Sequence, residues 1–542
     1  MIEAGPDGRN EPRIYIPGRR GSTLGTIYDW NFTTVPQPGA NGRVIAQNRG
    51  KVLGGSSALN LIAWDRGTDA DYNAWEELGT EGWNSMSMFA AMRQAETFQL
   101  TPEDAGITEP LGHEGPIHFL VNKFSPPQQE AFFPTMVNLG IDETFAFLDG
   151  NMTGYMHHTS NILLSNYTRS YSPAYLATAG SNLHLMINTT VSKLNLDSKA
   201  CVTGVTLEDG SIVNAKKEVI LSAGSLQSPQ LLELSGIGNA TILAAAGIDQ
   251  LVDNPHVGEN LQDHIRAVTA YQLRPNYTSP DIFRFNLTFA AEQLAQYYSN
   301  QTGYYDETAT GYAYLTWQQV LGNDSSFVAL AREAAESGNL IDQKKLAILE
   351  NGRMSEPQLE IIFSDGYLGF KGYPAANSSQ YGQQFFGLIA AIQHPFSRGS
   401  THINASNPRG KPVFNPNYLT QEYDLQAVKE GAKYLRKIAS TPPLSYTWTS
   451  EYEPGLDVVN TEAEWTEYAK NAVTTIWHPL GTCAMLPKEH GGVVDSKLKI
   501  YGVDRLRVVD ASIIPILPSG HIQSAVYGIA ERAAEMIAAQ WS

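Results

Sequence analysis

The sequence predicts an α/β protein in which one sheet is assembled from segments far apart in the chain, accompanied by a second folded unit. The chain has 542 residues, which is too long for one simple core. Strand-turn-helix patterns occur near residue 220, and a further strand and helix are predicted at the C-terminal end. The stretch between them has a different, aromatic-rich composition, which indicates a separate packed unit.

Four segments justify this fold class in turn. Residues 49–67 contain a Gly-Gly turn followed by ALNLIAW, which the pattern predicts to continue as a helix. Residues 218–238 predict a strand, a tight Ala-Gly turn, a helix and a closing Gly turn. Residues 505–511 predict a buried strand, and residues 523–540 place apolar side chains on one helical stripe.

The second unit is predicted from its aromatic side chains, which are dense between Tyr271 and Trp317. We take residues 269–395 as its centre. A group of rings like this is more often core than binding site, so packing is its expected role.

Composition and charge exclude some partners. Hydrophobic residues make up 42% and charged residues 17%, which is typical of a globular chain. The formal net charge of −18 argues against nucleic acid and anionic membrane surfaces, because both require a basic face. No apolar run reaches the ~18 residues that a membrane span needs, and no signal peptide is visible.

Two kinds of residue offer chemistry. The turn at 54–57 (GGSS) can hold a pyrophosphate at a helix start, where free N–H groups and the helix dipole favour negative charge, although the same letters also describe an ordinary loop. His478 and His521 each stand beside turn residues, where an imidazole can move a substrate hydroxyl proton. Taken alone, both are more easily explained as ordinary core or surface histidines.

Other chemical motifs are absent from the sequence. Residues 254–264 collect two histidines and two acids beside one another, but their spacing matches no metal-site signature, so no metal is expected. The chain has no Gly-x-Ser-x-Gly elbow of a hydrolase and no Gly-x-Gly-x-x-Gly dinucleotide loop.

Potential glycosylation sites are frequent, which favours a secreted glycoprotein over a chain that is merely rich in Asn, Ser and Thr. The asparagines that stand two positions before Ser or Thr, with no Pro between, are Asn31, Asn151, Asn166, Asn188, Asn239, Asn276, Asn286, Asn300, Asn323, Asn377 and Asn404. The two cysteines, Cys201 and Cys483, say little about the compartment.

Four motifs in a fixed order carry a family resemblance. They are GKVLGGSSALN at 50–60, GSLQSPQLLELSGIG at 224–238, VGENLQDH at 257–264 and HPLGTCAM at 478–485. His521 stands 43 positions after His478, a spacing similar to that of the family's catalytic pair. The chain resembles the glucose–methanol–choline (GMC) family of flavin-dependent oxidoreductases, in a fungal, secreted form near aryl-alcohol oxidases, glucose oxidases and glucose dehydrogenases.

The resemblance implies an FAD-binding, Rossmann-like domain built from distant segments, and a substrate domain with an antiparallel sheet and helices. It divides the chain into an FAD-binding region at 1–268, the heart of the substrate domain at 269–395 and a C-terminal region with the catalytic histidines at 396–535.

The opening letters MIEAG are explained by the same resemblance. In the family, a strand, a Gly-rich turn, a helix and a second strand precede this point, and Glu3 matches the acid that binds the adenosine ribose. The Gly-rich unit is missing here, which we interpret as a truncated gene model that has also lost a signal peptide. We therefore expect a secreted enzyme.

The resemblance also assigns the site residues, with FAD as the implied cofactor. His478 is the implied general base, and His521 the implied partner that hydrogen-bonds the same substrate oxygen. The residues implied to contact FAD are Glu3, Ser56, Asn60, Leu61, Ala63, Val191, Asp510 and Ala511.

The implied reaction is oxidation of a small-molecule alcohol, namely a sugar, an aryl or benzylic alcohol or an alcohol of secondary metabolism. Hydride passes to FAD, and O2 or a quinone reoxidises the cofactor. Two alternatives remain open: a redox-neutral, FAD-containing lyase or cyclase on the same scaffold, and an inactive remnant that lacks the Gly-rich unit.

Overall fold

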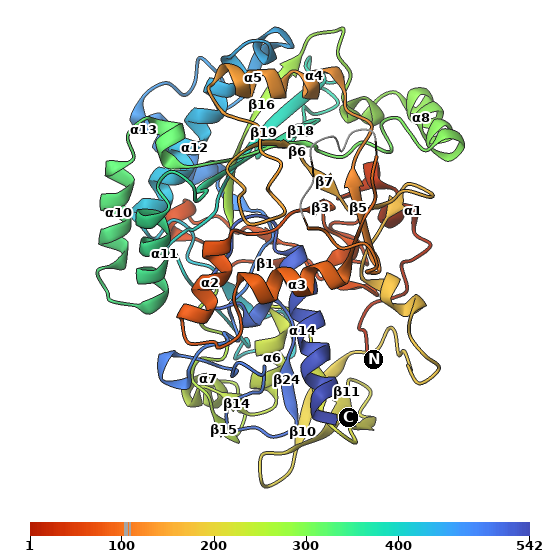
Figure 1. Ribbon diagram of the computed structural model, residues 1–542, viewed down its shortest axis with the longest axis vertical. Coiled ribbons are helices and arrows are strands. Elements are labelled where there is room, and N and C mark those ends of the chain that lie inside the picture. Colours follow the sequence, from red (N-terminus) through yellow and green to blue (C-terminus); the bar gives the residue numbers. More distant parts are fainter. Residues whose placement is uncertain (102–106, 108–109, 542) are drawn as a thin grey trace.

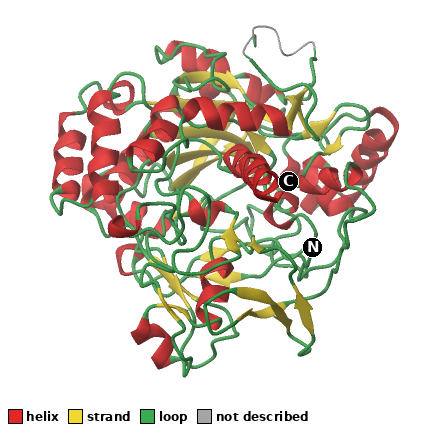
Figure 2. Cartoon of the chain, turned by 60° about the horizontal axis from the view of Figure 1, so that its bottom comes forward, coloured by secondary structure: helices red, strands yellow, loops and turns green. Residues whose placement is uncertain are grey.

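The structure is a computed structural model that describes residues 1–101, 107 and 110–541. A large antiparallel sheet with its covering helices occupies the upper part of Figure 1, and smaller sheets with the C-terminal helix occupy the lower part. Figure 2 shows the helices gathered around the strands, with long loops joining the two parts. No helix within these described ranges has the length and apolar character needed to cross a membrane.

The large sheet has the spatial order β22-β16-β19-β18-β17-β6, with β23 beside β16, and its pairings are antiparallel. Its strands are β22 (Trp448–Glu453), β16 (Ile265–Leu273), β19 (Phe385–Ile392), β18 (Leu359–Asp365), β17 (Gly311–Leu315), β6 (Gly154–His157) and β23 (Thr474–Thr475). This sheet confirms the antiparallel substrate-domain architecture that the sequence implies. It takes strands from all three predicted ranges of the chain, whose boundaries stay a prediction.

Strand β19 is apolar along its whole length, as expected of a strand that is covered on both faces of the sheet. Every residue of β19 is buried, and α12 (Glu422–Ser440) packs against β19 and β16. The main core lies between α12 and the sheet and includes Leu388, Val428 and Leu435. The helices placed around this part are α4 (Pro127–Glu130), α5 (Phe132–Asn138), α8 (Leu287–Asn300), α9 (Trp317–Leu321), α10 (Ser325–Ala335), α11 (Leu340–Asn351) and α13 (Glu462–Ala472).

The lower part joins segments from both ends of the chain, as the sequence predicts. Strand β13 (Val219–Leu221) pairs in parallel with β24 (Leu506–Val508), and α6 (Gln227–Leu234) follows β13 through a Gly turn. Helix α14 (Gln523–Trp541) packs against α3 (Ser85–Ala95). The strand, turn and helix predicted for 218–238, the strand at 505–511 and the helix at 523–540 are confirmed.

The helix predicted after the Gly-Gly turn is wrong. Gly55–Ala58 forms only one short 3-10 turn (η3), and Ala63–Trp64 is strand β3. Asn60 explains the break, because its Oδ1 accepts hydrogen bonds from Ile62 N at 3.1 Å and from Arg169 Nη1 at 2.6 Å. Ile62 consequently adopts a φ of 63°, which no helix contains.

Strand β3 places the segment after the Gly-Gly turn in a second, four-stranded sheet. This sheet has the order β3-β7-β5-β4, and its other strands are β7 (Thr159–Ser160), β5 (Ile117–Val121) and β4 (Glu96–Phe98). A fully buried ion pair between Arg66 and Glu96 anchors the end of β3. Trp64 Nε1 donates to the same carboxylate at 3.1 Å, so the residue between them, Asp65, is firmly placed.

The remaining elements include a three-stranded antiparallel sheet, short strand pairs and short helices. They are α1 (Pro12–Tyr15), α2 (Asp69–Glu77), α7 (Ala240–Ala245), β1 (Phe32–Thr33), β2 (Ala46–Gln47), β8 (Ile162–Leu163), β9 (Thr168–Arg169), β10 (Val191–Leu196), β11 (Val202–Leu207), β12 (Ile212–Asn214), β14 (Ile237–Gly238), β15 (Val252–Asp253), β20 (Ser400–His402) and β21 (Val413–Asn415).

Candidate active site

The structure brings the two predicted histidines together. His478 follows β23, and His521 lies two residues before α14 begins. Their ring centroids are 5.1 Å apart and the rings are nearly perpendicular, at 81°. Neither ring has a hydrogen-bond partner at Nε2 among the described residues. Two imidazole nitrogens are thus left for a ligand.

A chain of hydrogen bonds fixes the tautomer of His478. The backbone carbonyl of Gln393 accepts from His264 Nε2 at 3.0 Å, so His264 carries its proton on Nε2. His264 Nδ1 is then an acceptor, and His478 Nδ1–H donates a hydrogen bond to it at 2.8 Å. His478 therefore presents an unprotonated Nε2, which is the form that a general base requires.

Asp263 holds the backbone of His478 in place. Its carboxylate accepts from His478 N at 2.9 Å, and from Tyr418 Oη and Thr475 Oγ1 at 2.6 Å each. The neighbouring Trp477 has a φ of 66°, an uncommon conformation for a bulky residue, and its carbonyl accepts from Arg49 Nη2 at 2.7 Å. This strained turn is held by the hydrogen bonds of Asp263 and Arg49, so it fixes the orientation of the His478 ring.

Burial and neighbouring positive charge keep His478 neutral. Burial is the largest cause that lowers the pKa of His478 well below its usual value, and His264, His521 and Arg49 lower it further. His478 is thus deprotonated at neutral pH and ready to accept a proton.

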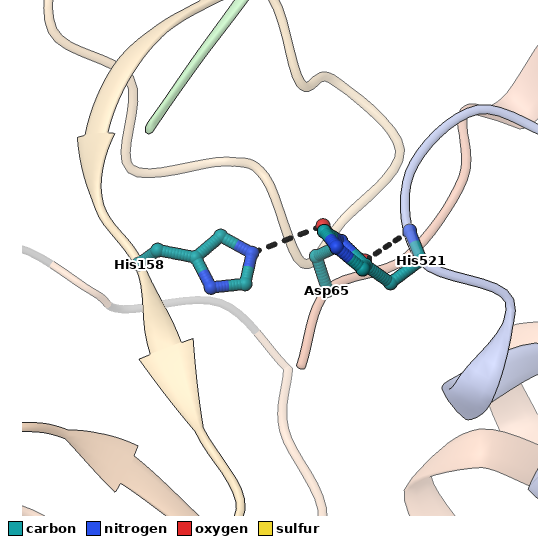
Figure 3. A group of neighbouring side chains, drawn as sticks. All are labelled: Asp65, His158 and His521. Carbon is teal, nitrogen blue, oxygen red and sulfur yellow. Dashed lines mark hydrogen bonds and ion pairs between the residues drawn. The ribbon is translucent and has the colours of Figure 1, made fainter. Parts of the chain in front are cut away.

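His521 has the opposite environment, shown in Figure 3. Its Nδ1 lies 3.1 Å from Asp65 Oδ2 and 3.5 Å from Glu360 Oε1, and its backbone N–H donates to Asp65 Oδ1 at 2.8 Å. Burial alone would lower the pKa of His521, but the Glu360 and Asp65 carboxylates outweigh it and raise that pKa to about 9. Burial in turn raises the pKa of Glu360 to about 7. The site therefore pairs a neutral imidazole with a cationic one.

The predicted FAD-contact residues after the Gly-Gly turn lie along one path towards His521. Ser56 Oγ accepts from Gly50 N at 3.1 Å inside the turn, and Leu61 is 39% exposed. Asn60 Nδ2 hydrogen-bonds Gln523 Oε1, and Gln523 Nε2 donates to the Ala63 carbonyl at 3.1 Å. The first turn of α14, which follows His521, is thus tied to this path.

Glu3 is hydrogen-bonded to the segment that leads into Val191. Glu3 N donates to the Met186 carbonyl at 2.8 Å, and the Glu3 carbonyl accepts from Thr189 N at 2.9 Å, two residues before β10 starts at Val191. The Glu3 carboxylate accepts from Gly5 N at 2.7 Å, and burial raises its pKa. Both residues stay partly exposed.

Asp510 and Ala511 lie at the end of β24, beside the turn after β13. Asp510 Oδ2 accepts from Gly224 N at 2.8 Å, and Oδ1 accepts from Ser512 N at 2.8 Å. The Asp510 carboxylate is therefore satisfied within the protein, where it joins the two parallel strands at their carboxyl ends. Ala511 is partly exposed at this edge.

The residues present fit an FAD molecule. Gly55 (φ 53°) and Gly224 (φ 82°) both have open space where a Cβ would stand, so ligand atoms can approach the backbone of these two turns closely. Ser225 Oγ and Trp477 Nε1 are buried without a hydrogen-bond partner. Open glycine turns, unpaired donors and the Glu3 carboxylate match the phosphates, ring edges and ribose hydroxyls of a dinucleotide.

Several site residues escaped the sequence interpretation: Asp65, His158, Tyr314 and Glu360. Asp263 and His264 stand in the quoted motif VGENLQDH, but the sequence interpretation assigned them no role beside His478. The acids and histidines of 254–264 do not form one common site. Glu259 forms an ion pair with His402, whereas His264 is hydrogen-bonded to His478. The signal for Asp65 was an acid placed directly after a buried strand, in LIAWDRG. His158 and Glu360 left no comparable signal.

The fold and the site together define an FAD-dependent oxidoreductase of two parts, with two facing imidazoles and two open glycine turns. Models of the GMC oxidoreductase family match residues 15–266 and 395–530. A GMC oxidoreductase family protein of Malassezia sympodialis, Mala s 12, is 34% identical over 99% of this chain and 88% of its own length.

Solved structures agree with this assignment. An FAD-dependent oxidoreductase from Chaetomium thermophilum is 28% identical, with a TM-score of 0.88 over 100% of this chain and 94% of that chain. A fungal aryl-alcohol oxidase is 26% identical, with a TM-score of 0.84 and the same coverage. The chain belongs to the GMC oxidoreductase family, whose members use FAD and act on CH–OH groups as oxidases or dehydrogenases.

Proposed function

We propose that this chain oxidises a small alcohol to a carbonyl compound, with His478 as the general base and His521 as the hydrogen-bond donor to the same oxygen. The observation that carries this proposal is the fixed tautomer of His478, whose free Nε2 stands beside the cationic ring of His521. When bound, FAD supplies the two-electron acceptor for the hydride that leaves the alcohol carbon, and O2 or a quinone takes those electrons afterwards.

Residues of the protein carry out the proton transfer, stabilise the substrate oxygen and bind the cofactor. His478 Nε2 takes the hydroxyl proton, and the positive charge stays on this ring because burial lowers the pKa of His264 to about 3. His521 donates towards the oxygen as negative charge develops on it. We propose that three surfaces bind FAD. They are the segment from Ser56 to Ala63, the surface at Glu3 and Val191, and the surface at Asp510 and Ala511.

The substrate class is proposed from the family and the site. Among the structural relatives, the aryl-alcohol oxidase acts on an aryl alcohol by its name, and we propose aryl alcohols and sugars as the first compounds to test. Anaerobic mixing of the FAD-loaded protein with each alcohol should bleach the flavin absorbance. A yellow protein that no alcohol bleaches, but that isomerises an alcohol without net oxidation, would instead favour the lyase alternative. A colourless protein would favour the inactive remnant.

The electron acceptor is tested in the same preparation. Once an alcohol has bleached the flavin, air and a quinone dye are added in separate cuvettes. Rapid recovery of the yellow colour with release of hydrogen peroxide identifies an oxidase. Recovery with the dye alone identifies a dehydrogenase.

The pH profile of kcat/KM is expected to be broad. His478 must be neutral to accept a proton, and its pKa lies below the usual 6.5, so the acid limb should lie below pH 6.5. His521 must stay protonated to donate, so the alkaline limb should fall at about 9. Initial rates from about pH 4 to about pH 10 check this. Loss of most activity between pH 7 and 8 would contradict the cationic assignment of His521.

We also propose that the protein is a secreted glycoprotein. None of the eleven candidate asparagines is buried, whereas the buried asparagines Asn122, Asn161 and Asn254 all lie outside such triplets. An oligosaccharyl transferase can therefore reach these sites. Protein secreted from a fungal host should lose mass in several steps on graded enzymatic deglycosylation. A single unshifted band would contradict this proposal.

A further inference from the structure

Tyr312 is a buried tyrosine beside His521 that the proposed reaction does not use. It lies on β17, its ring stacks on that of His158 with the centroids 3.9 Å apart, and its centroid is 5.9 Å from that of His521. Its hydroxyl forms no hydrogen bond within the part of the chain that the structure describes, and protein atoms do not enclose it completely. The Tyr312 hydroxyl therefore borders space near the His521 ring that a ligand can reach.

Tyr312 and its neighbour Tyr314 differ in how their hydroxyls are used. The two residues are two positions apart on β17, so their side chains lie on the same face of the sheet. The Tyr314 hydroxyl lies 2.6 Å from Asp65 Oδ2 and 2.9 Å from Glu360 Oε1, the two carboxylates that contact His521. Burial, followed by these carboxylates, raises the pKa of Tyr312 well above 10, so its hydroxyl keeps a proton to donate. Tyr314 is thus engaged by the acids of the site, whereas Tyr312 has a donor and an acceptor available.

An ion pair between Arg20 and Glu307 lies near the same hydroxyl. Arg20 Nη2 is 3.0 Å from Glu307 Oε2, and the two side chains are 13% and 3% exposed. After burial and the two carboxylates, the charges of Arg20 and Glu307 also act on the pKa of Tyr312. A Cβ placed on Gly21 would meet Leu61 Cδ2 at 3.5 Å, and Leu61 belongs to a surface that we propose for FAD. The segment that carries Arg20 thus reaches from the surroundings of Tyr312 to that surface.

We propose that Tyr312 is a specificity-determining residue, whose hydroxyl binds a second hydroxyl group on the alcohol that the site oxidises. This inference rests on the proposed function, because His478 and His521 hold the hydroxyl that reacts. A second hydroxyl fits because it can accept a hydrogen bond from Tyr312 Oη or donate one to it. An analogue with a methyl group at that place would cover the Tyr312 hydroxyl and leave it unpaired, so the site discriminates against it.

The neighbouring charges favour a neutral group over an anionic one. Arg20 is already paired with Glu307, so a substrate carboxylate finds no unpaired guanidinium there. The carboxylates of Asp65 and Glu360 also repel an anion near Tyr312. The substrate class that follows is a diol or polyol without an acidic group.

The test compares two pairs of alcohols in the FAD-loaded protein. One pair is para-(hydroxymethyl)benzyl alcohol and para-ethylbenzyl alcohol. The other is a terminal alkanediol and the straight-chain alkanol in which a methyl group replaces its second hydroxyl. Stopped-flow bleaching of the flavin gives the limiting rate and the apparent Kd for each compound. The ratio of rate to Kd should be about 10-fold higher for each diol, of which its two equivalent hydroxymethyl groups account for about twofold and the hydrogen bond for the rest.

Tyr312→Phe keeps the ring that stacks on His158 and removes only the hydroxyl. The preference for each diol should fall to about twofold, because its apparent Kd rises about 5-fold while the limiting rate stays the same. The two alcohols without a second hydroxyl should bind and react as in the parent. Tyr446→Phe is the matched control, since Tyr446 is 64% exposed and this change should leave every value unchanged.

A second variant tests the charge argument. Glu307→Gln leaves the Arg20 guanidinium without its counter-charge. The parent should oxidise para-carboxybenzyl alcohol poorly. In Glu307→Gln the ratio of rate to Kd for this compound should rise about 10-fold, the usual contribution of a hydrogen bond to a charged group. The values for para-ethylbenzyl alcohol should not change.

Two results would overturn the inference while leaving the proposed function intact. One is a parent protein that prefers the diols by no more than the statistical factor of their two hydroxyls. The other is a Tyr312→Phe variant that keeps the preference of the parent. If Tyr312→Phe does not fold, Glu307→Gln decides, since no gain with para-carboxybenzyl alcohol contradicts a substrate group beside Arg20. A parent protein whose flavin none of these alcohols bleaches overturns the proposed function and this inference with it.

Discussion

Replacing His478 by alanine is expected to lower kcat by about 10²-fold or more, the usual contribution of a positioned general base. The ring is the one imidazole of the facing pair that is held neutral, with its Nε2 free of protein partners. Substrate binding should change much less, because His521 still donates to the alcohol oxygen. Stopped-flow measurement of flavin bleaching in the variant and the parent separates the two effects.

Two further variants sharpen this test. His264→Phe removes the acceptor for His478 Nδ1 and should slow the same step, because the His478 tautomer is then no longer fixed. His490→Ala changes an exposed histidine and should leave the rate at the parent value. Turnover of His478→Ala within a few-fold of the parent would remove His478 from the mechanism.

Replacing Glu96 by alanine is expected to destabilise the protein by about 3–5 kcal/mol, because it leaves the guanidinium of Arg66 buried without its counter-charge. Trp64 Nε1 and Gly112 N would lose the same acceptor. The midpoint of urea unfolding measures this loss. At moderate urea concentrations the activity should fall together with the stability, because this ion pair anchors the end of β3, which is followed by Asp65.

The matched comparison is the double variant Arg66→Met/Glu96→Leu. Removing both charges avoids an isolated buried ion, so the double variant should be more stable than Glu96→Ala alone. A double variant that is less stable than Glu96→Ala would contradict this expectation, because the unpaired guanidinium would then not be the cause of the loss. Glu96→Gln, which keeps an acceptor oxygen for Trp64, should lie between the parent and Glu96→Ala.

The sequence was sufficient for the features encoded in continuous motifs. The strand-turn-helix at 218–238, the strand at 505–511 and the final helix are local patterns, and His478 and His521 stand inside or beside such patterns. The predicted helix after residue 57 failed for a non-local reason, because Arg169 reaches Asn60 from more than a hundred positions away. A helical run of letters cannot reveal a partner of that kind.

The surroundings of His521 could not be predicted for the same reason. Tyr314 and Glu360 meet because β17 and β18 pair in the register that places them opposite each other. Asp65 and His158 are 93 positions apart and meet through the order of strands in two sheets. Side-chain contacts of this type depend on register, and register was not readable from composition or periodicity.

Gln393, the residue just past the end of β19, has a consequence for how this enzyme can change. Its main-chain oxygen accepts a hydrogen bond from His264 Nε2, and its side-chain oxygen accepts from Gly520 N at 2.7 Å, next to His521. Any shift of this strand end therefore displaces the proton acceptor and the proton donor together rather than separating them. Laboratory evolution of the substrate pocket can therefore alter the surrounding loops. Insertions near the end of β19 should instead abolish turnover without unfolding the chain.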